Sequence, residues 1–218
     1  MANLLTLKAT LRYTSPPVWR RLTVPDTLTF WELHFALQIL FDWESYHLFE
    51  FRQHTRGATR FRAGSPSLGA EDPLFDDEPA PQDPRTVPLN AILTAPTNQL
   101  TYTYDFGDDW QHDIVVEQVT ALVPAAPAPA IQCLGGKRAA PLEDMGGIPG
   151  YEQLLDLLAK KAAGKRKRMP SEYAGLGKFD PDAFDLARYN HNLTFMPQIV
   201  AEQNRLLAAH QARRPAAD

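Results

Sequence analysis

Residues 101–117, TYTYDFGDDWQHDIVVE, restrict the fold of this chain more than any other segment. Apolar and polar side chains alternate on both sides of a short acidic stretch, which predicts two antiparallel strands with one buried face. Both apolar sets reach one core only if the loop has an odd number of residues, three or five. We therefore expect Phe106 to lie opposite Trp110, or Tyr104 opposite His112.

The loop and its flanks carry Asp105, Asp108 and Asp109. Glycine and aspartate suit tight turns, which explains Asp108 and Asp109 without any function. His112 is not explained in this way. On a core-facing strand it is either a buried histidine bonded to a carbonyl or carboxylate, or a ligand or general base at the rim of a cleft. His47, on another aromatic-rich strand, leaves the same two alternatives open.

The first half of the chain alternates between strand and helix periodicity. Strands are predicted at 4–14, 18–25, 46–52 and 59–63, with a helix at 29–41 and a helical turn at 89–93. Thr29 followed by Glu32 is a capping-box pattern at the start of that helix. This order predicts an α+β fold, in which a mixed β-sheet packs on one main helix (β-grasp-like), followed by a helical C-terminal region.

We expect two regions along the chain. Residues 1–120 form the sheet domain, with an acidic, proline-rich loop at 64–88 that has little to bury and is expected to be mobile. Residues 121–218 hold a linker, a glycine-rich loop and helices that pack on the first region. One of these helices is predicted at 180–193, with Asp180 as its N-cap and Pro181 as its first residue.

A second informative motif is CLGGKRAAPLEDMGGIPGYEQLL at 133–155. Its glycine clusters and prolines predict an irregular loop whose backbone polar groups need partners elsewhere. Glu143 and Asp144 in its centre suit helix capping, an ion pair or metal binding. The sequence leaves these three uses open.

We predict that this loop and the aspartate-rich turn are two walls of one cleft. Asp105 would accept hydrogen bonds from the loop backbone or from Arg138. Glu143 or Asp144 would face His112 and raise the pKa of its imidazole, because a nearby carboxylate favours the cation. Asp105 is then expected to be structural, whereas Glu143 and His112 would serve the site.

The charge distribution says more than the net charge of −4, which gives no general attraction to nucleic acid. Residues 71–84 are acidic and residues 160–168 are basic. The candidate nucleic-acid contacts are Lys160, Lys161, Lys165, Arg166, Lys167 and Arg168. A single cysteine excludes an internal disulfide, and the first residues do not resemble a signal peptide, so a cytoplasmic location is expected.

Two motifs, YDFGDDWQH at 104–112 and PLEDMGGIPGY at 141–151, resemble the pRiA plasmid open-reading-frame-three-like family. The resemblance extends to PPVWRR at 16–21, HLFEF at 47–51 and FDPDAFD at 179–185. Many members have cysteines where this chain has Ala140 and Met145, so a cysteine zinc site is excluded here. Members are often labelled TnpR-resolvase-like because of their association with mobile elements. Recombinase chemistry has no support here, because no serine or tyrosine stands in the required setting.

The expected function is that of a non-catalytic accessory protein of mobile genetic elements, contacting nucleic acid or a protein partner. A protein partner could also add a strand to the sheet edge. The alternative is a metal-dependent hydrolase that binds a divalent cation. Its candidate ligands are Asp105, Asp108, Asp109, His112, Glu143 and Asp144.

Overall fold

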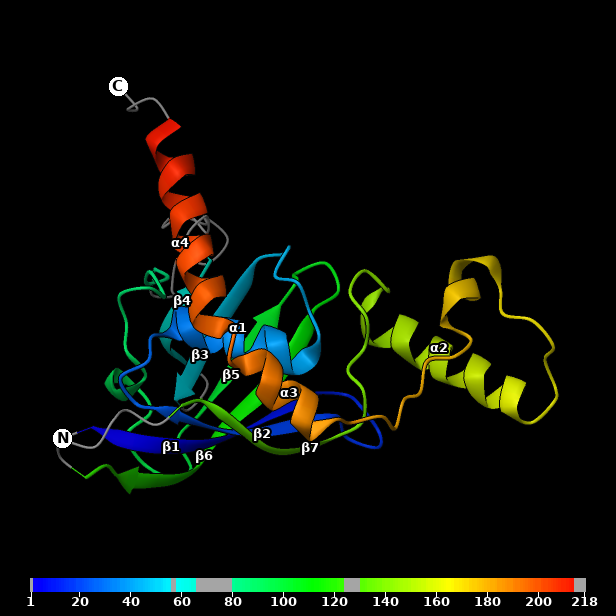
Figure 1. Cartoon of the computed structure of the whole chain (residues 1–218), viewed down its shortest axis with the longest axis horizontal. Helices are drawn as coiled ribbons and strands as arrows, with labels where there is room; N and C mark the ends of the chain where they lie inside the picture. The colour runs from blue at the N-terminus through cyan, green and yellow to red at the C-terminus, as the bar shows by residue number, and fades with distance from the viewer. Residues whose placement is uncertain (1, 56–57, 66–79, 124–129, 214–218) are drawn as a thin grey trace.

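The structure is a computed structural model that describes residues 2–55, 58–65, 80–123 and 130–213. Within these residues a seven-stranded sheet has the order β4-β3-β5-β6-β1-β2-β7 (Figure 1). The strands are β1 (Asn3–Leu11), β2 (Trp19–Pro25), β3 (Phe49–Thr55), β4 (Ala58–Gly64), β5 (Gln99–Tyr104), β6 (Trp110–Ala121) and β7 (Gln132–Lys137). All neighbouring strands pair antiparallel. The predicted α+β class is confirmed. The prediction of a mixed sheet is wrong, because every strand lies beside antiparallel neighbours. The β-grasp assignment stays a prediction.

Several helices accompany the sheet, and the predicted helical C-terminal region is confirmed. They are α1 (Phe30–Phe41), α2 (Gly147–Ala162), α3 (Leu186–Leu193) and α4 (Met196–Arg213), with 3-10 turns at Leu89–Ala91 and Ser171–Leu176. Among the described residues, the helices include none that is long and apolar enough to cross a membrane. In Figure 1, α1 and α3 lie over the same side of the sheet, whereas α2 points away from it.

Helix α1 begins with the predicted capping box. The Thr29 hydroxyl accepts a hydrogen bond from the Glu32 amide at 3.2 Å, and the Glu32 carboxylate accepts one from the Thr29 amide at 2.8 Å. Ten of its twelve residues are buried, and the helix packs against α3 and α4 as well as the sheet. The helix ends at Asp42, whose left-handed conformation (φ 58°) redirects the chain. The segment that follows, residues 43–48, carries His47.

The hairpin of β5 and β6 places Tyr104 opposite Trp110 and Tyr102 opposite His112. The five-residue connection, residues 105–109, is called the acidic turn below. All four of these side chains are buried, so the shared buried face and the five-residue loop are confirmed. The predicted pairs, Phe106 with Trp110 and Tyr104 with His112, are wrong. The ladder ends at Tyr104 because Asp105 adopts φ 56°, and Phe106 lies 46% exposed.

The C-terminal half of the chain joins the same sheet, because β7 pairs with β2. Asn190 in α3 bonds both the amide and the carbonyl of Cys133, at 2.9 and 3.0 Å. The predicted N-cap at Asp180 is wrong. Asp180 accepts the Asp182 amide in a local turn, and Asp185 caps α3 through the Arg188 amide.

The predicted mobile loop at 64–88 falls largely on residues 66–79, which lie outside the described residues. Its last part, 80–88, is anchored to the start of α1. Trp31 and Phe30 donate their backbone amides to the carbonyls of Pro84 and Val87, at 3.0 and 3.1 Å. These bonds satisfy two amides that the first turn of a helix otherwise leaves unpaired.

Candidate metal site

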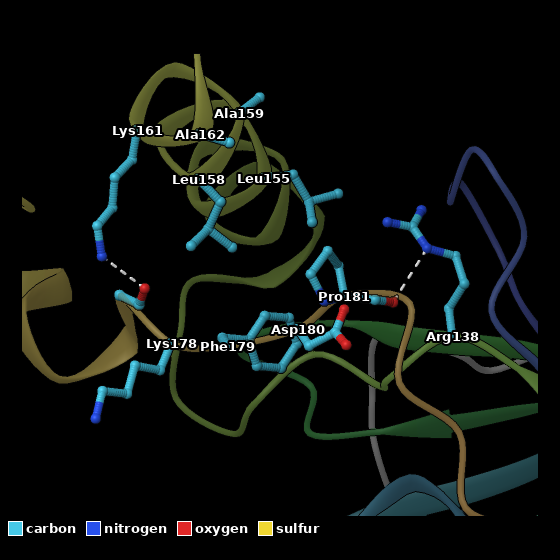
Figure 2. A pocket seen from close by; sticks show the side chains of 11 residues that line it. Arg138, Leu155, Leu158, Ala159, Lys161, Ala162, Lys178, Phe179, Asp180 and Pro181 are labelled. Carbon is cyan, nitrogen blue, oxygen red and sulfur yellow. Dashed lines mark hydrogen bonds between the residues drawn. The ribbon is translucent and has the colours of Figure 1, made fainter. Parts of the chain in front are cut away.

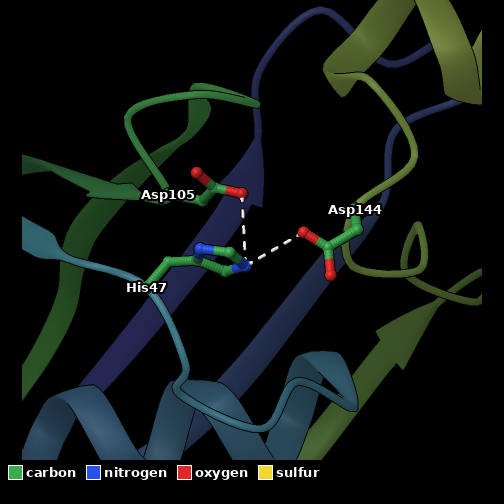
Figure 3. A group of neighbouring side chains, drawn as sticks. All are labelled: His47, Asp105 and Asp144. Carbon is green, nitrogen blue, oxygen red and sulfur yellow. Dashed lines mark ion pairs between the residues drawn. The ribbon is translucent and has the colours of Figure 1, made fainter.

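His47, Asp105 and Asp144 lie together at one end of the sheet (Figure 3). The His47 Nε2 atom is 3.2 Å from Asp144 Oδ1 and 3.6 Å from Asp105 Oδ2. One ligand atom from each side chain lies within 4.8 Å of the other two. The three residues come from the segment after α1, the acidic turn and the loop before α2, so the fold brings together three distant parts of the chain.

The cluster is enclosed on one side and open on the other. The Asp105 side chain is 11% exposed, that of His47 is 31% exposed and that of Asp144 is 72% exposed. The Nε2 atom of His47 is itself buried, and within the described residues it makes no hydrogen bond. A ring nitrogen in this position meets the carboxylates either as an N–H donor or as a ligand of a cation that the three side chains share.

Both aspartates of the cluster sit in the left-handed region, each with φ 56°. Aspartate tolerates this conformation better than most residues. The Asp105 amide donates to the Leu48 carbonyl at 2.9 Å, and its Oδ1 accepts the Gly107 amide at 2.9 Å. This local bonding holds the turn and leaves Oδ2 directed at His47 (Figure 3).

The loop at residues 141–147, called the PLEDMGG loop below, is held against the acidic turn by Asp108. Its Oδ2 accepts the amides of Met145 at 3.1 Å and Gly146 at 3.2 Å, next to the start of α2. The predicted contact between turn and loop is present, but Asp108 makes it in place of Asp105. Arg138 instead donates to the Pro181 and Pro16 carbonyls, at 3.2 and 3.3 Å.

Glu143 faces Tyr104 and not His112. Its carboxylate accepts hydrogen bonds from the Tyr104 hydroxyl and from the Glu44 amide, the latter at 2.8 Å. The same hydroxyl accepts the Tyr46 amide at 3.1 Å. Burial, together with the Glu143 carboxylate, raises the pKa of Tyr104 well above its usual range. Glu143 therefore fixes the segment that carries His47 and is not part of the cluster.

His112 is fully buried among aromatic rings, 4.5 Å from the Phe41 ring and 5.3 Å from the Trp43 ring between centroids. The prediction that a carboxylate raises its pKa is wrong. Burial lowers the pKa of His112 to about 3, because the apolar core disfavours the imidazolium. His112 is thus a neutral core histidine, the first of the two alternatives left by the sequence.

A second buried histidine, His34, was not singled out from the sequence as a site residue. Its ring bonds the Tyr102 hydroxyl at 2.7 Å and the Ser45 hydroxyl at 2.6 Å. Burial lowers its pKa to about 3. Gln38 on the same helix accepts the Ser45 amide at 2.8 Å. Since Ser45 precedes His47 by two residues, α1 supports one side of the cluster. In the sequence, His34 stands at the edge of the apolar stripe of the predicted helix at 29–41, and Leu33-His34 also fits the family pattern.

The remaining candidates lie elsewhere. The exposed Asp109 accepts the side-chain amide of Gln111 at 3.0 and 2.8 Å. Lys160 pairs with Asp156, and Lys161 donates to the Gly177 carbonyl at 2.7 Å. Residues 165–168, with Lys165, Arg166, Lys167 and Arg168, are exposed beyond the end of α2.

Two cavities are lined by residues of the C-terminal half of the chain. One of about 690 Å³ lies between α2 and residues 177–181, with Leu155, Leu158 and Phe179 among its walls (Figure 2). A second cavity of about 450 Å³ has Asp144 in its wall and therefore touches the His47 cluster. Both volumes fall in the range of small-molecule sites.

The fold and the cluster define an α+β protein with an antiparallel sheet and a candidate metal site at one sheet end. Residues 3–188 match the family described as "Plasmid pRiA4b ORF-3-like protein", and the chain belongs to that family.

The chain is 32% identical over 191 residues to "Uncharacterized protein y4hQ" of Sinorhizobium fredii, covering 87% of this chain and 90% of that one. It also resembles the crystal structure of the "Protein of Unknown Function MM3350" from Methanosarcina mazei Go1. That similarity has a TM-score of 0.68 and 32% identity, over 86% of this chain and 97% of the other. None of these three descriptions mentions a resolvase.

Proposed function

We propose that this chain binds a divalent metal ion through His47, Asp105 and Asp144, and that the bound metal supports hydrolysis. The observation that carries the proposal is the buried His47 Nε2 atom, which makes no hydrogen bond among the described residues and lies near two carboxylates from distant segments. One imidazole and two carboxylates suit ions such as Zn²⁺ and Mn²⁺ better than Ca²⁺, which prefers a shell of oxygen ligands alone.

The number of ligands favours a catalytic over a purely structural site. Catalytic zinc sites have three protein ligands and keep a position for water or substrate, whereas structural sites are closed by four. Asp144 is 72% exposed, so the cluster is accessible to solvent from its side. When bound, such an ion polarises a substrate carbonyl or phosphoryl oxygen and lowers the pKa of water.

A matched pair of variants tests the metal site. Asp144 and Asp109 are both exposed aspartates with positive φ, of 56° and 53°, and only Asp144 belongs to the cluster. Asparagine tolerates the same conformation, so neither Asp144→Asn nor Asp109→Asn should strain the backbone. Thermal melts are recorded with EDTA and then with Zn²⁺, Mn²⁺ or Mg²⁺.

We expect Zn²⁺ or Mn²⁺ to stabilise the wild type and Asp109→Asn by about 2.7 kcal/mol at a free concentration about one hundred times Kd. Asp144→Asn should lose most of this increment. A wild-type melting temperature that no divalent ion and no chelator changes would contradict the metal site.

A second candidate function is nucleic-acid contact, in an accessory role for mobile elements. The favouring observation is that the exposed basic residues 165–168 stand at the far end of α2, away from the sheet (Figure 1). Replacing Lys165, Arg166, Lys167 and Arg168 by alanine should then abolish a weak binding that falls steeply with salt. Binding that survives the fourfold replacement would contradict this role.

A further inference from the structure

The cavity of about 450 Å³ that adjoins the His47 cluster contains a carboxylate-rich wall. Its acidic residues are Glu143, Asp144 and Glu172, and its other walls include Leu142, Met145 and Leu176. No lysine, arginine or histidine is among the residues that line it. The cavity is formed where the PLEDMGG loop meets the 3-10 turn Ser171–Leu176.

These three carboxylates differ in how strongly their present contacts hold them, and therefore in how readily they can bind a ligand. Glu143 is occupied by the Tyr104 hydroxyl and the Glu44 amide. Asp144 turns one oxygen towards His47. Glu172 is exposed and is bonded only weakly, by the Ser171 hydroxyl at 3.2 Å. Glu172 is therefore the group best placed to exchange its present contact for a ligand.

We propose that this cavity is the substrate pocket of the metal site and selects an aliphatic molecule that carries an ammonium group. This inference rests on the proposed metal site. The apolar walls accept the aliphatic part, Glu172 pairs with the ammonium group, and an oxygen of the ligand reaches the metal beside Asp144. Two aspartates neutralise a divalent ion, so the charges of Glu143 and Glu172 remain to attract a cation and repel an anion.

The probes are two pairs of hydroxamates, because a hydroxamate binds metal directly. One pair is 6-aminohexanohydroxamic acid and hexanohydroxamic acid, and the other is 4-aminobutanohydroxamic acid and butanohydroxamic acid. Within each pair the molecules differ only in the terminal amine, which is charged at neutral pH. Calorimetric titrations use the full chain loaded with Zn²⁺. The variant is Glu172→Gln, and the control is Glu152→Gln, an exposed residue of α2 outside the cavity.

We expect the amine to tighten binding about tenfold or more in at least one pair, since hydrogen bonds to charged groups are the stronger ones. This advantage should disappear in Glu172→Gln and persist in Glu152→Gln. If Zn²⁺ binds and both pairs show no amine preference, the pocket assignment is overturned while the metal site stands. An amine preference unchanged in Glu172→Gln also overturns it. Failure of Zn²⁺ to bind overturns both proposals.

Discussion

The carboxylate of Asp108 lies 3.2 Å from the backbone nitrogen of Gly146 and accepts its hydrogen bond across 38 positions of sequence. The Met145 amide donates to the same oxygen. Through these two bonds the acidic turn holds the PLEDMGG loop, and hence Asp105 and Asp144 both stay near the Nε2 atom of His47. We expect Asp108→Ala to cost about 1–3 kcal/mol of unfolding free energy, because it removes the acceptor of two amides. Urea unfolding measures this cost.

The same variant should also weaken metal binding, because Asp144 loses its support. Asp109→Asn is the control, since asparagine tolerates the positive φ of 53° at this position and the exposed Asp109 side chain bonds Gln111 and not the PLEDMGG loop. Equal stability of the two variants would show that Asp108 does not hold the loop.

The contact between turn and loop is tight at Gly147. A Cβ atom built there would lie 2.4 Å from the Asp108 carbonyl oxygen, whereas one built at Gly146 would meet nothing within 4 Å. Both glycines have positive φ, of 65° and 84°, so alanine is strained at either position. We expect Gly146→Ala to cost about 1–2 kcal/mol for this strain alone. Gly147→Ala should cost clearly more, because the loop must move off the turn. Similar unfolding free energies for the two would argue against this packing.

Stability should fall on acidification because His34 and His112 are buried as neutral imidazoles. Burial lowers the pKa of each to about 3, whereas the unfolded chain titrates near pH 6.5. The unfolded state therefore takes up protons that the folded state does not. The stabilisation is complete above about pH 6.5 and is lost progressively as the pH falls towards 3.

The two histidines together contribute about 2.7 kcal/mol per pH unit well below pH 6.5. In His112→Phe the slope of unfolding free energy against pH should decrease by the contribution of one histidine, because about one proton fewer is taken up on unfolding. The control is the exposed His210→Gln, which should leave the slope unchanged. An unaltered slope in His112→Phe would mean that His112 is protonated in the folded protein.

Tyr104 links the core hairpin to the PLEDMGG loop, and its replacement tests that link. Tyr104→Phe removes a donor to Glu143 and an acceptor for the Tyr46 amide. We expect a loss of about 1–3 kcal/mol. Because Glu143 lies outside the cluster, metal affinity should fall far less than in Asp144→Asn. Complete loss of metal binding in Tyr104→Phe would place Glu143 or Tyr104 among the ligands.

The sheet face could be predicted because alternation in residues 101–117 reports directly which side chains are buried. The capping box of Thr29 and Glu32 could also be predicted, because its two partners are only three residues apart in the sequence. Pairing order could not be predicted, because antiparallel and mixed sheets use the same alternation.

The site was predicted only in part. The sequence motifs identified both loops. The role of each side chain within the loops, however, depends on the backbone conformation of single residues. Positive φ at Asp105 directs its carboxylate to His47 and leaves the PLEDMGG loop to Asp108. The sequence reasoning assigned Asp105 to structure, and Glu143 and His112 to the site. In the structure Glu143 bonds Tyr104, His112 lies in the core, and His47 takes the central position.

The central claim is that a metal ion occupies the space between His47 Nε2, Asp105 Oδ2 and Asp144 Oδ1. Crystals grown with Zn²⁺ and measured at two wavelengths on either side of its absorption edge test this directly. We expect an anomalous peak about 2.0–2.2 Å from all three atoms. The absence of a peak there, with His47 Nε2 donating a direct hydrogen bond to one of the two carboxylates, would contradict the metal site.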